Sequence, residues 1–198
     1  RSLREGLRLA VSTETRSLQQ QLVEKDIPAL KKIFARVFEL RFNSSICLGS
    51  ANYPCVRRYR QVIRRGGFKA EQEEVLANLA ERMRRSPAVH RNEISGMDSV
   101  LWNELSRDSE HCLGRFCEHQ QECVYQKARE EWESSSLLVV NHALLCTNLQ
   151  MGRVHLPVFA MLIVDEAHSF PGTAARHFGF ELDSRSFPHY LRNAFETH

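Results

Sequence analysis

The feature that most constrains this sequence is the stretch Met161 to His168, which reads Met-Leu-Ile-Val-Asp-Glu-Ala-His. A short, nearly continuous apolar run is typical of a buried parallel strand. This run ends abruptly in two adjacent carboxylates, Asp165 and Glu166. In open α/β sheets, ligands bind just beyond the carboxyl ends of the strands. The alternative is a strand that simply runs into a capped turn, because aspartate is a common helix N-cap.

The two carboxylates suit nucleotide chemistry. In P-loop NTPases an aspartate at such a position holds the Mg²⁺ of the nucleotide, and a neighbouring glutamate can act as general base for the attacking water. Asp165 is therefore a candidate ligand of Mg²⁺ and Glu166 a candidate base that activates water. His168, the last residue of this stretch, is also compatible with an ordinary surface position that has no functional role.

Strand-like and helix-like segments alternate along the chain, which predicts an α/β fold with a parallel sheet. The first helix is expected to stop or restart at Pro28. The longest apolar stretch is too short to span a bilayer, and no secretory signal is visible. We expect a monomeric, cytoplasmic protein without membrane contact. The expected strands are 7–11, 45–48, 137–140 and 161–164, and the expected helices are 15–24, 71–85, 98–105 and one that opens at Asn141-His142.

The net charge of +3 conceals an uneven distribution. Residues 1–70 contain 15 of the 27 Lys and Arg residues but only 5 of the 24 Asp and Glu residues. The first part is therefore strongly basic and the remainder acidic. Such an asymmetry indicates a face for a polyanion on the first part, although a solvated basic helix would give the same composition.

Six cysteines in a chain without a secretory signal indicate metal binding or catalysis rather than a disulfide framework. Cys47 and Cys146 lie in apolar runs and are predicted to be core residues. The spacing of the others is wider than that of most zinc-binding pairs, whereas iron–sulfur clusters accept more varied spacing. An iron–sulfur cluster, a zinc ion and unliganded core cysteines all remain open at this point. These four are Cys55, Cys112, Cys117 and Cys123.

The sequence contains six motifs whose order and spacing resemble those of the XPD/DinG-type family of iron–sulfur DNA helicases, and most of all those of its bacterial DinG/YoaA branch. The resemblance covers nearly the whole chain, and its specificity lies in the order and spacing of the motifs. They are Ser12-Thr13-x-Thr15-x-x-Leu18-Gln19-x-Gln21-Leu22, Lys25-Asp26-Ile27-Pro28, Gly49-x-x-Asn52-Tyr53-x-Cys55-x-x-Arg58, the three cysteines from Cys112 to Cys123, Val139-Val140-Asn141-His142-Ala143-Leu144, and Asp165-Glu166-Ala167-His168.

The resemblance implies roles for individual residues. Asp165, Glu166 and His168 match the Walker B motif of the DEAH type, in which the histidine couples the nucleotide to the DNA side. The four cysteines that are not in apolar runs match the ligands of a [4Fe–4S] cluster. Ser12, Thr13 and Thr15 match motif Ia, which contacts the phosphates of single-stranded DNA. Such contacts position a strand without reading its bases.

The resemblance also implies an architecture, namely a RecA-like parallel sheet flanked by helices with a helical iron–sulfur cluster insertion. Residues 1–50 and 136–180 would belong to the first motor domain, 51–135 to the insertion, and 181–198 to the start of an Arch-like insertion. The partners implied are single-stranded DNA and duplex junctions, with ATP-driven 5′→3′ movement in repair or replication stress. Protein partners are left open.

The sequence departs from the family pattern in two places. Leu48 and Ser50 flank Gly49 where the family has basic residues, which weakens a DNA contact there, although Arg57, Arg58 and Arg60 could compensate. No Gly-x-x-x-x-Gly-Lys-Ser/Thr phosphate loop occurs either. We therefore expect an internal part of the first motor domain that does not hydrolyse ATP alone. The alternative is a non-catalytic nucleic-acid-binding or scaffold module with a four-cysteine metal site.

Overall fold

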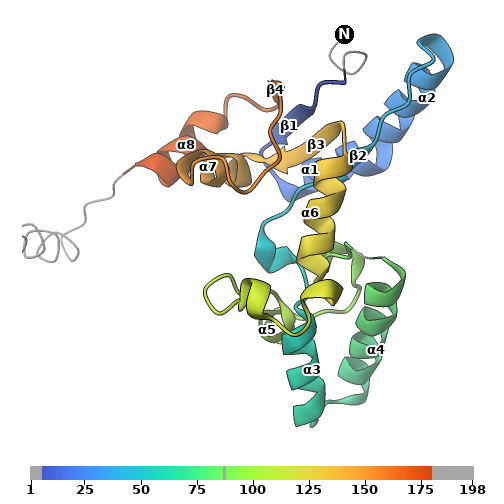
Figure 1. The fold of residues 1–198 in the computed structure, drawn as a ribbon, viewed down its shortest axis with the longest axis vertical. Coiled ribbons are helices and arrows are strands. Elements are labelled where there is room, and N and C mark those ends of the chain that lie inside the picture. The colour runs from blue at the N-terminus through green and yellow to red at the C-terminus, as the bar shows by residue number, and fades with distance from the viewer. Residues whose placement is uncertain (1–5, 87, 180–198) are drawn as a thin grey trace, which may run out of the picture.

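The computed structural model of the chain describes residues 6–86 and 88–179. Four parallel strands form one sheet in the order β2-β3-β1-β4 (Figure 1). The α/β class with a parallel sheet flanked by helices, expected from the alternating pattern, is confirmed. Because all four strands run in the same direction, their carboxyl ends lie at one edge of the sheet. The strands are β1 (Leu9–Thr13), β2 (Ser44–Ile46), β3 (Leu137–Asn141) and β4 (Met161–Val164).

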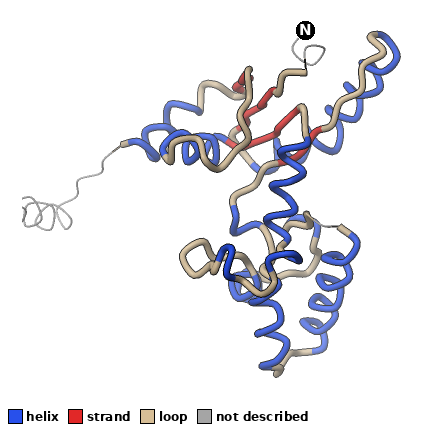
Figure 2. Tube along the Cα trace, viewed as in Figure 1, coloured by secondary structure: helices blue, strands red, loops and turns tan. Residues whose placement is uncertain are grey.

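The helices fall into two groups. One group flanks the sheet, and the other lies in the segment between β2 and β3, which contains helices and loops but no strand among its described residues (Figure 2). The first group is α1 (Arg16–Gln21), α2 (Ile27–Val37), α7 (His142–Gln150) and α8 (Phe170–Phe178). The second is α3 (Val56–Arg65), α4 (Ala70–Arg85), α5 (Ser99–Leu105) and α6 (Val124–Ser134). No helix in the described ranges is long and apolar enough to cross a membrane.

Most expected elements are present with shifted bounds, and an α-helix restarts at Pro28, which is one of the two outcomes expected there. A π-helical turn, Leu22–Asp26, connects α1 directly to α2, and Pro28 lies in the first turn of α2. Proline is tolerated there because the first helical N–H groups have no partner within the helix. The helices α3, α6 and α8 were not among the expected elements. The segment 181–198, expected to begin an Arch-like insertion, lies outside the described residues.

The expectation that the strand before Asp165 is buried is wrong for this chain. Strand β4 lies last in the strand order and pairs with β1 alone among the described strands. Its residues Met161, Leu162 and Ile163 are 47%, 38% and 49% exposed. By contrast, Leu138, Val139 and Val140 of the central strand β3 are fully buried. An apolar run fits either position, because hydrophobicity does not fix the order of strands in a sheet.

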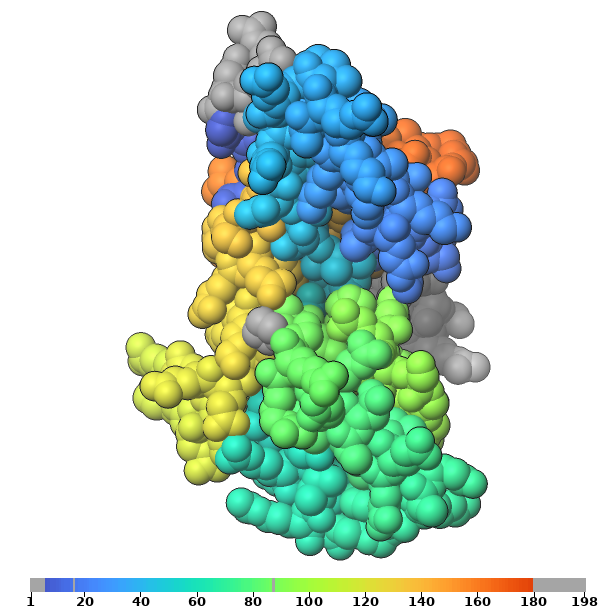
Figure 3. All heavy atoms as spheres, turned by 90° about the vertical axis from the view of Figure 1, so that its right-hand side faces the viewer, coloured from blue at the N-terminus to red at the C-terminus, as the bar shows by residue number. Residues whose placement is uncertain are grey.

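An aromatic cluster joins the helical segment to the sheet. The rings of Tyr53 and Tyr125 lie 5.5 Å apart, and those of Tyr125 and Trp132 lie 5.9 Å apart. Trp132 also donates a hydrogen bond from its indole nitrogen to the carbonyl of Ile46 in β2, at 3.1 Å. Helix α6, which carries Tyr125 and Trp132, thus fixes the helical segment below the sheet, giving the elongated molecule seen in Figure 3.

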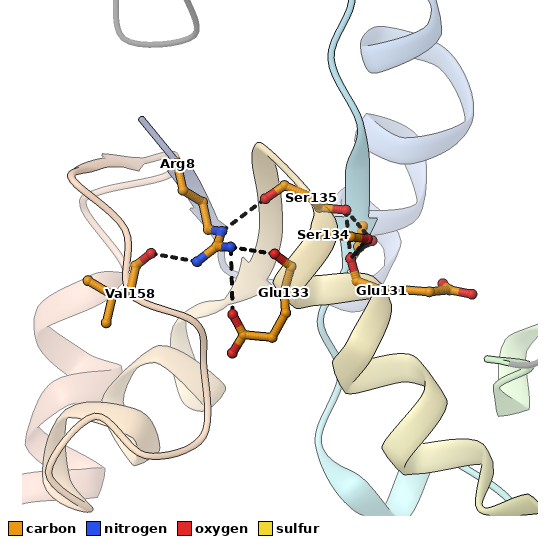
Figure 4. A network of polar contacts seen from close by, with 7 residues as sticks. Arg8, Glu131, Glu133, Ser134, Ser135 and Val158 are labelled. Carbon is orange, nitrogen blue, oxygen red and sulfur yellow. Dashed lines mark hydrogen bonds and ion pairs between the residues drawn. The ribbon is translucent and has the colours of Figure 1, made fainter. Parts of the chain in front are cut away.

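A second joint is centred on Arg8, just before β1 (Figure 4). Its guanidinium donates hydrogen bonds to the carbonyls of Ser135, Val158 and Glu133, at 2.9, 2.9 and 2.5 Å. Ser135 lies at the end of α6, and Val158 lies in the loop before β4. One side chain therefore ties the exit of the helical segment to both β1 and the approach to β4.

Candidate functional site

The carboxyl edge of the sheet brings together two motifs that lie about 150 residues apart in the sequence. Ser12 pairs with Val164 in the register between β1 and β4. The backbone N–H of Asp165 donates to the carbonyl of Ser12 at 2.8 Å. The end of the Ser-Thr-x-Thr motif and the start of the Asp-Glu-Ala-His motif are therefore hydrogen-bonded neighbours.

The Asp-Glu-Ala-His segment forms an exposed turn between β4 and α8. Glu166 has a φ of +50°, in the left-handed region that few non-glycine residues adopt. The turn is held by hydrogen bonds within itself, since the Glu166 N–H donates to the side-chain Oδ1 of Asp165 at 3.0 Å and the Ser169 N–H donates to the Glu166 carbonyl at 2.9 Å. Backbone strain of this kind often occurs at functional sites.

The side chains of this turn are accessible to a ligand. Asp165 and Glu166 are exposed, and adjacent carboxylates of this kind can hold a hydrated Mg²⁺, which usually keeps several of its waters. His168 is 76% exposed, and its Nδ1 lies 3.3 Å from Glu166 Oε2. Both catalytic candidates and the histidine therefore lie on one surface, open to solvent.

The three residues expected to contact DNA differ in their exposure. Thr15 is exposed and caps α1, accepting a hydrogen bond from the Leu18 N–H at 3.2 Å. Ser12 and Thr13 are fully buried. The Ser12 hydroxyl lies 2.7 Å from Nδ1 of His142, so its side chain is engaged inside the protein. Of these three residues, Thr15 alone is exposed to solvent.

His142 is a residue of this edge to which the sequence analysis gave no role. It follows β3 directly and begins α7, where Asn141 serves as N-cap and accepts from the Leu144 N–H at 2.7 Å. The sequence contained the information needed to place His142 at this edge, because Asn141 and His142 follow a predicted strand just as Asp165 follows another. Parallel strands would place all of these residues at the same edge.

The cysteines separate into two kinds. Cys47 and Cys146 are fully buried in the core, as expected from the apolar runs around them, and burial raises the pKa of both thiols. The other four are partly exposed and line one pocket between the start of α3, the 107–120 loop and the start of α6. The structure therefore brings together the four side chains expected to be cluster ligands.

Within this pocket, Cys55 and Cys123 each directly precede a helix, α3 and α6. Burial raises the pKa of the Cys123 thiol, and the nearby Cys55 raises it further. No group of three or more His, Cys, Asp or Glu side chains in the described ranges is arranged to hold a single metal ion. Four thiols around one pocket still provide the donor set of a cube-shaped cluster, which separates its ligands more widely than one ion does.

Arg58, expected to contact DNA, fastens α3 to the end of α5. Its guanidinium donates to the carbonyls of Glu104 and Asn103, at 2.8 and 2.6 Å, and lies 3.6 Å from Asp108. A positive side chain at the last carbonyls of a helix is stabilising. Arg58 therefore supports one wall of the cysteine pocket.

The neighbouring arginines of α3 have similar roles. Arg57 donates to the carbonyl of His111, beside Cys112, at 3.0 Å. Arg60 forms an ion pair with Glu122, beside Cys123, at 2.8 Å. The basic helix α3 thus holds the loops that carry the later cysteines, a role that its composition alone did not reveal.

Comparison with known proteins gives relatives along nearly the whole chain, although no family model matches it. The ATP-dependent DNA helicase YoaA of Haemophilus influenzae is 32% identical over 192 residues, which cover 91% of this chain and 29% of the relative. YoaA of Escherichia coli is 29% identical, covering 93% of the chain and 29% of the relative. The ATP-dependent DNA helicase DinG of Salmonella typhimurium is 29% identical, covering 84% and 25%. The chain thus spans less than a third of these relatives, and the resemblance to the DinG/YoaA helicases indicated by its motifs is confirmed.

Proposed function

We propose that the chain is part of the first, RecA-like motor domain of an ATP-dependent DNA helicase. The observation that supports this proposal is the hydrogen bond from the Asp165 N–H to the Ser12 carbonyl, because it joins the segment that would bind single-stranded DNA to the segment that would bind the nucleotide. Residues 1–50 and 136–180 would form the motor part, and 51–135 an iron–sulfur insertion. The names of the relatives support the same activity.

In the intact protein, ATP would bind at the carboxyl edge of the sheet. Asp165 would hold Mg²⁺, and Glu166 would accept a proton from the attacking water and orient it toward the γ-phosphate. His168, within reach of Glu166, would respond to the state of that carboxylate. Thr15 and the backbone around it would hold the phosphates of single-stranded DNA. The resemblance further implies 5′→3′ movement along single strands at duplex junctions.

The four pocket cysteines would hold a [4Fe–4S] cluster. When bound, the cluster would supply a rigid cross-link between the starts of α3 and α6 and the loop between α5 and α6. The donor set and its gathering around one pocket support this assignment. The arginines of α3 already hold the same loops by hydrogen bonds and an ion pair, so the chain itself shapes the pocket.

The decisive experiment is an ATPase assay on the full-length protein with and without single-stranded DNA. Glu166→Gln should retain binding of Mg²⁺–ATP but lose turnover by about 10²-fold or more, because the amide keeps the shape of the side chain but cannot accept a proton. Asp165→Asn should instead weaken the binding of Mg²⁺. Wild-type turnover in Glu166→Gln would refute the Walker B assignment and favour a non-catalytic scaffold.

A further inference from the structure

His142 lies where three segments of the candidate motor meet. Its side chain is only 1% exposed. On one side its Nδ1 is 2.7 Å from the Ser12 hydroxyl at the end of β1. On the other side its ring packs edge-on against Phe170, with centroids 5.2 Å apart and an interplanar angle of 85°.

Both contacts lead to the proposed functional motifs. Ser12 precedes Thr15 by three residues, and its carbonyl accepts the hydrogen bond from the Asp165 N–H. Phe170 begins α8, and its backbone N–H donates to the carbonyl of Ala167 within the turn. A single buried ring therefore contacts the strand end that leads to the DNA-binding segment and the helix that follows the catalytic carboxylates.

The second nitrogen of the imidazole is unpaired. Nε2 of His142 is buried and has no hydrogen-bond partner. A buried polar atom without a partner is uncommon in folded proteins and disfavours the arrangement that contains it. Whichever tautomer bonds to Ser12, Nε2 retains an unused donor or acceptor. The Nε2 atom therefore has a hydrogen-bonding capacity that the contact with Ser12 does not use.

We propose that His142 is a positioning residue that transmits the binding of single-stranded DNA at the Thr15 segment to the Asp165–Glu166 turn. It touches neither nucleotide nor DNA, and acts through Ser12 on one side and Phe170 on the other. This inference rests on the proposed function, and it assigns to His142 the link between the two ligand sites of that function.

The test measures ATP turnover of the full-length protein with and without saturating single-stranded DNA, together with the Kd for each ligand. In His142→Leu the ratio of DNA-stimulated to basal turnover should fall about tenfold, within the usual range of coupling between two sites. The two Kd values, each measured without the other ligand, should change much less than the ratio. His142→Asn, which keeps a polar atom near the position of Nδ1, should recover part of the ratio.

Ser12→Ala tests the same link from the other side. It should lower the ratio as His142→Leu does, and the double variant should lower it no further, because the two residues form one connection. Asn148→Ala is the matched control. Asn148 is a buried polar residue of the same helix that accepts hydrogen bonds from the N–H groups of His155 and Leu156. This variant should lower thermal stability while the ratio stays at the wild-type value.

Several results would overturn the inference. One is a fall of basal and stimulated turnover by the same factor in His142→Leu, as expected for a purely structural residue. Another is a double variant, His142→Leu with Ser12→Ala, in which the ratio of stimulated to basal turnover falls by the product of the two single effects. If His142→Leu does not fold, as judged by circular dichroism, an unchanged ratio in Ser12→Ala overturns the inference and a lowered one supports it. If the wild-type protein hydrolyses ATP but single-stranded DNA does not stimulate it, the coupling alone is refuted. If the wild-type protein hydrolyses no ATP at all, the proposed function is refuted as well.

Discussion

The two candidate sites of this protein are built in opposite ways. The Asp165–Glu166 turn is a continuous stretch of sequence, held by hydrogen bonds among its own backbone and side-chain atoms and by one bond to β1. The cysteine pocket collects residues from Cys55 to Cys123, and arginines of α3 hold its loops. The first site is therefore local and exposed, and the second depends on contacts between segments far apart in the sequence. A substitution outside the functional residues should affect the second site more.

The largest effect is expected when the pocket cysteines are replaced, which tests whether the pocket binds an iron–sulfur cluster. Protein purified without oxygen should be brown and contain about four irons per chain. Cys55→Ser, Cys112→Ser, Cys117→Ser and Cys123→Ser should each lose iron and colour, whereas the core variants Cys47→Ser and Cys146→Ser should keep both. Metal analysis and visible absorbance give the answer, and stoichiometric zinc without iron would contradict it.

A smaller effect is expected at the arginines that shape the pocket. Arg58→Met should lower the free energy of unfolding by about 2 kcal/mol, because two charge-assisted hydrogen bonds to helix-end carbonyls are lost. Arg64→Met, at an exposed position of the same helix, should change it by less than about 0.5 kcal/mol. Urea unfolding of both variants measures the difference. Equal stabilities would mean that α3 does not hold the pocket.

The smallest expected effect concerns single-stranded DNA at the local site. The chain should bind it weakly, without base preference and with a strong dependence on salt, as backbone contacts imply. Thr15→Ala should weaken binding about threefold to tenfold through the loss of one hydrogen bond to a phosphate, and Thr15→Ser should restore it. Thr147→Ala is the control, since that hydroxyl is engaged with the Ala143 carbonyl within its own helix. Fluorescence anisotropy at two salt concentrations distinguishes these variants, and binding that does not respond to salt would exclude phosphate contacts.

The difference between the sites explains which predictions succeeded. The parallel α/β fold and the core positions of Cys47 and Cys146 followed from hydrophobic patterns, which depend on near neighbours in the sequence. The burial expected for β4 was wrong, because an apolar strand has the same pattern at the centre of a sheet and at its edge. The restart of a helix at Pro28 was one of the two outcomes expected from the sequence, since proline is accommodated where a helix begins.

The sequence by itself determined that a strand ends at Asp165 and Glu166 and that four cysteines lie outside apolar runs. It also determined which family the order of the motifs resembles. Only the tertiary structure decided that Ser12 faces His142 rather than solvent, and that Arg57 and Arg58 hold loops of the cysteine pocket. The physical reason is that charge and hydroxyl groups identify what a side chain can bind, whereas the partner it meets depends on which distant backbone groups the fold brings within hydrogen-bonding distance.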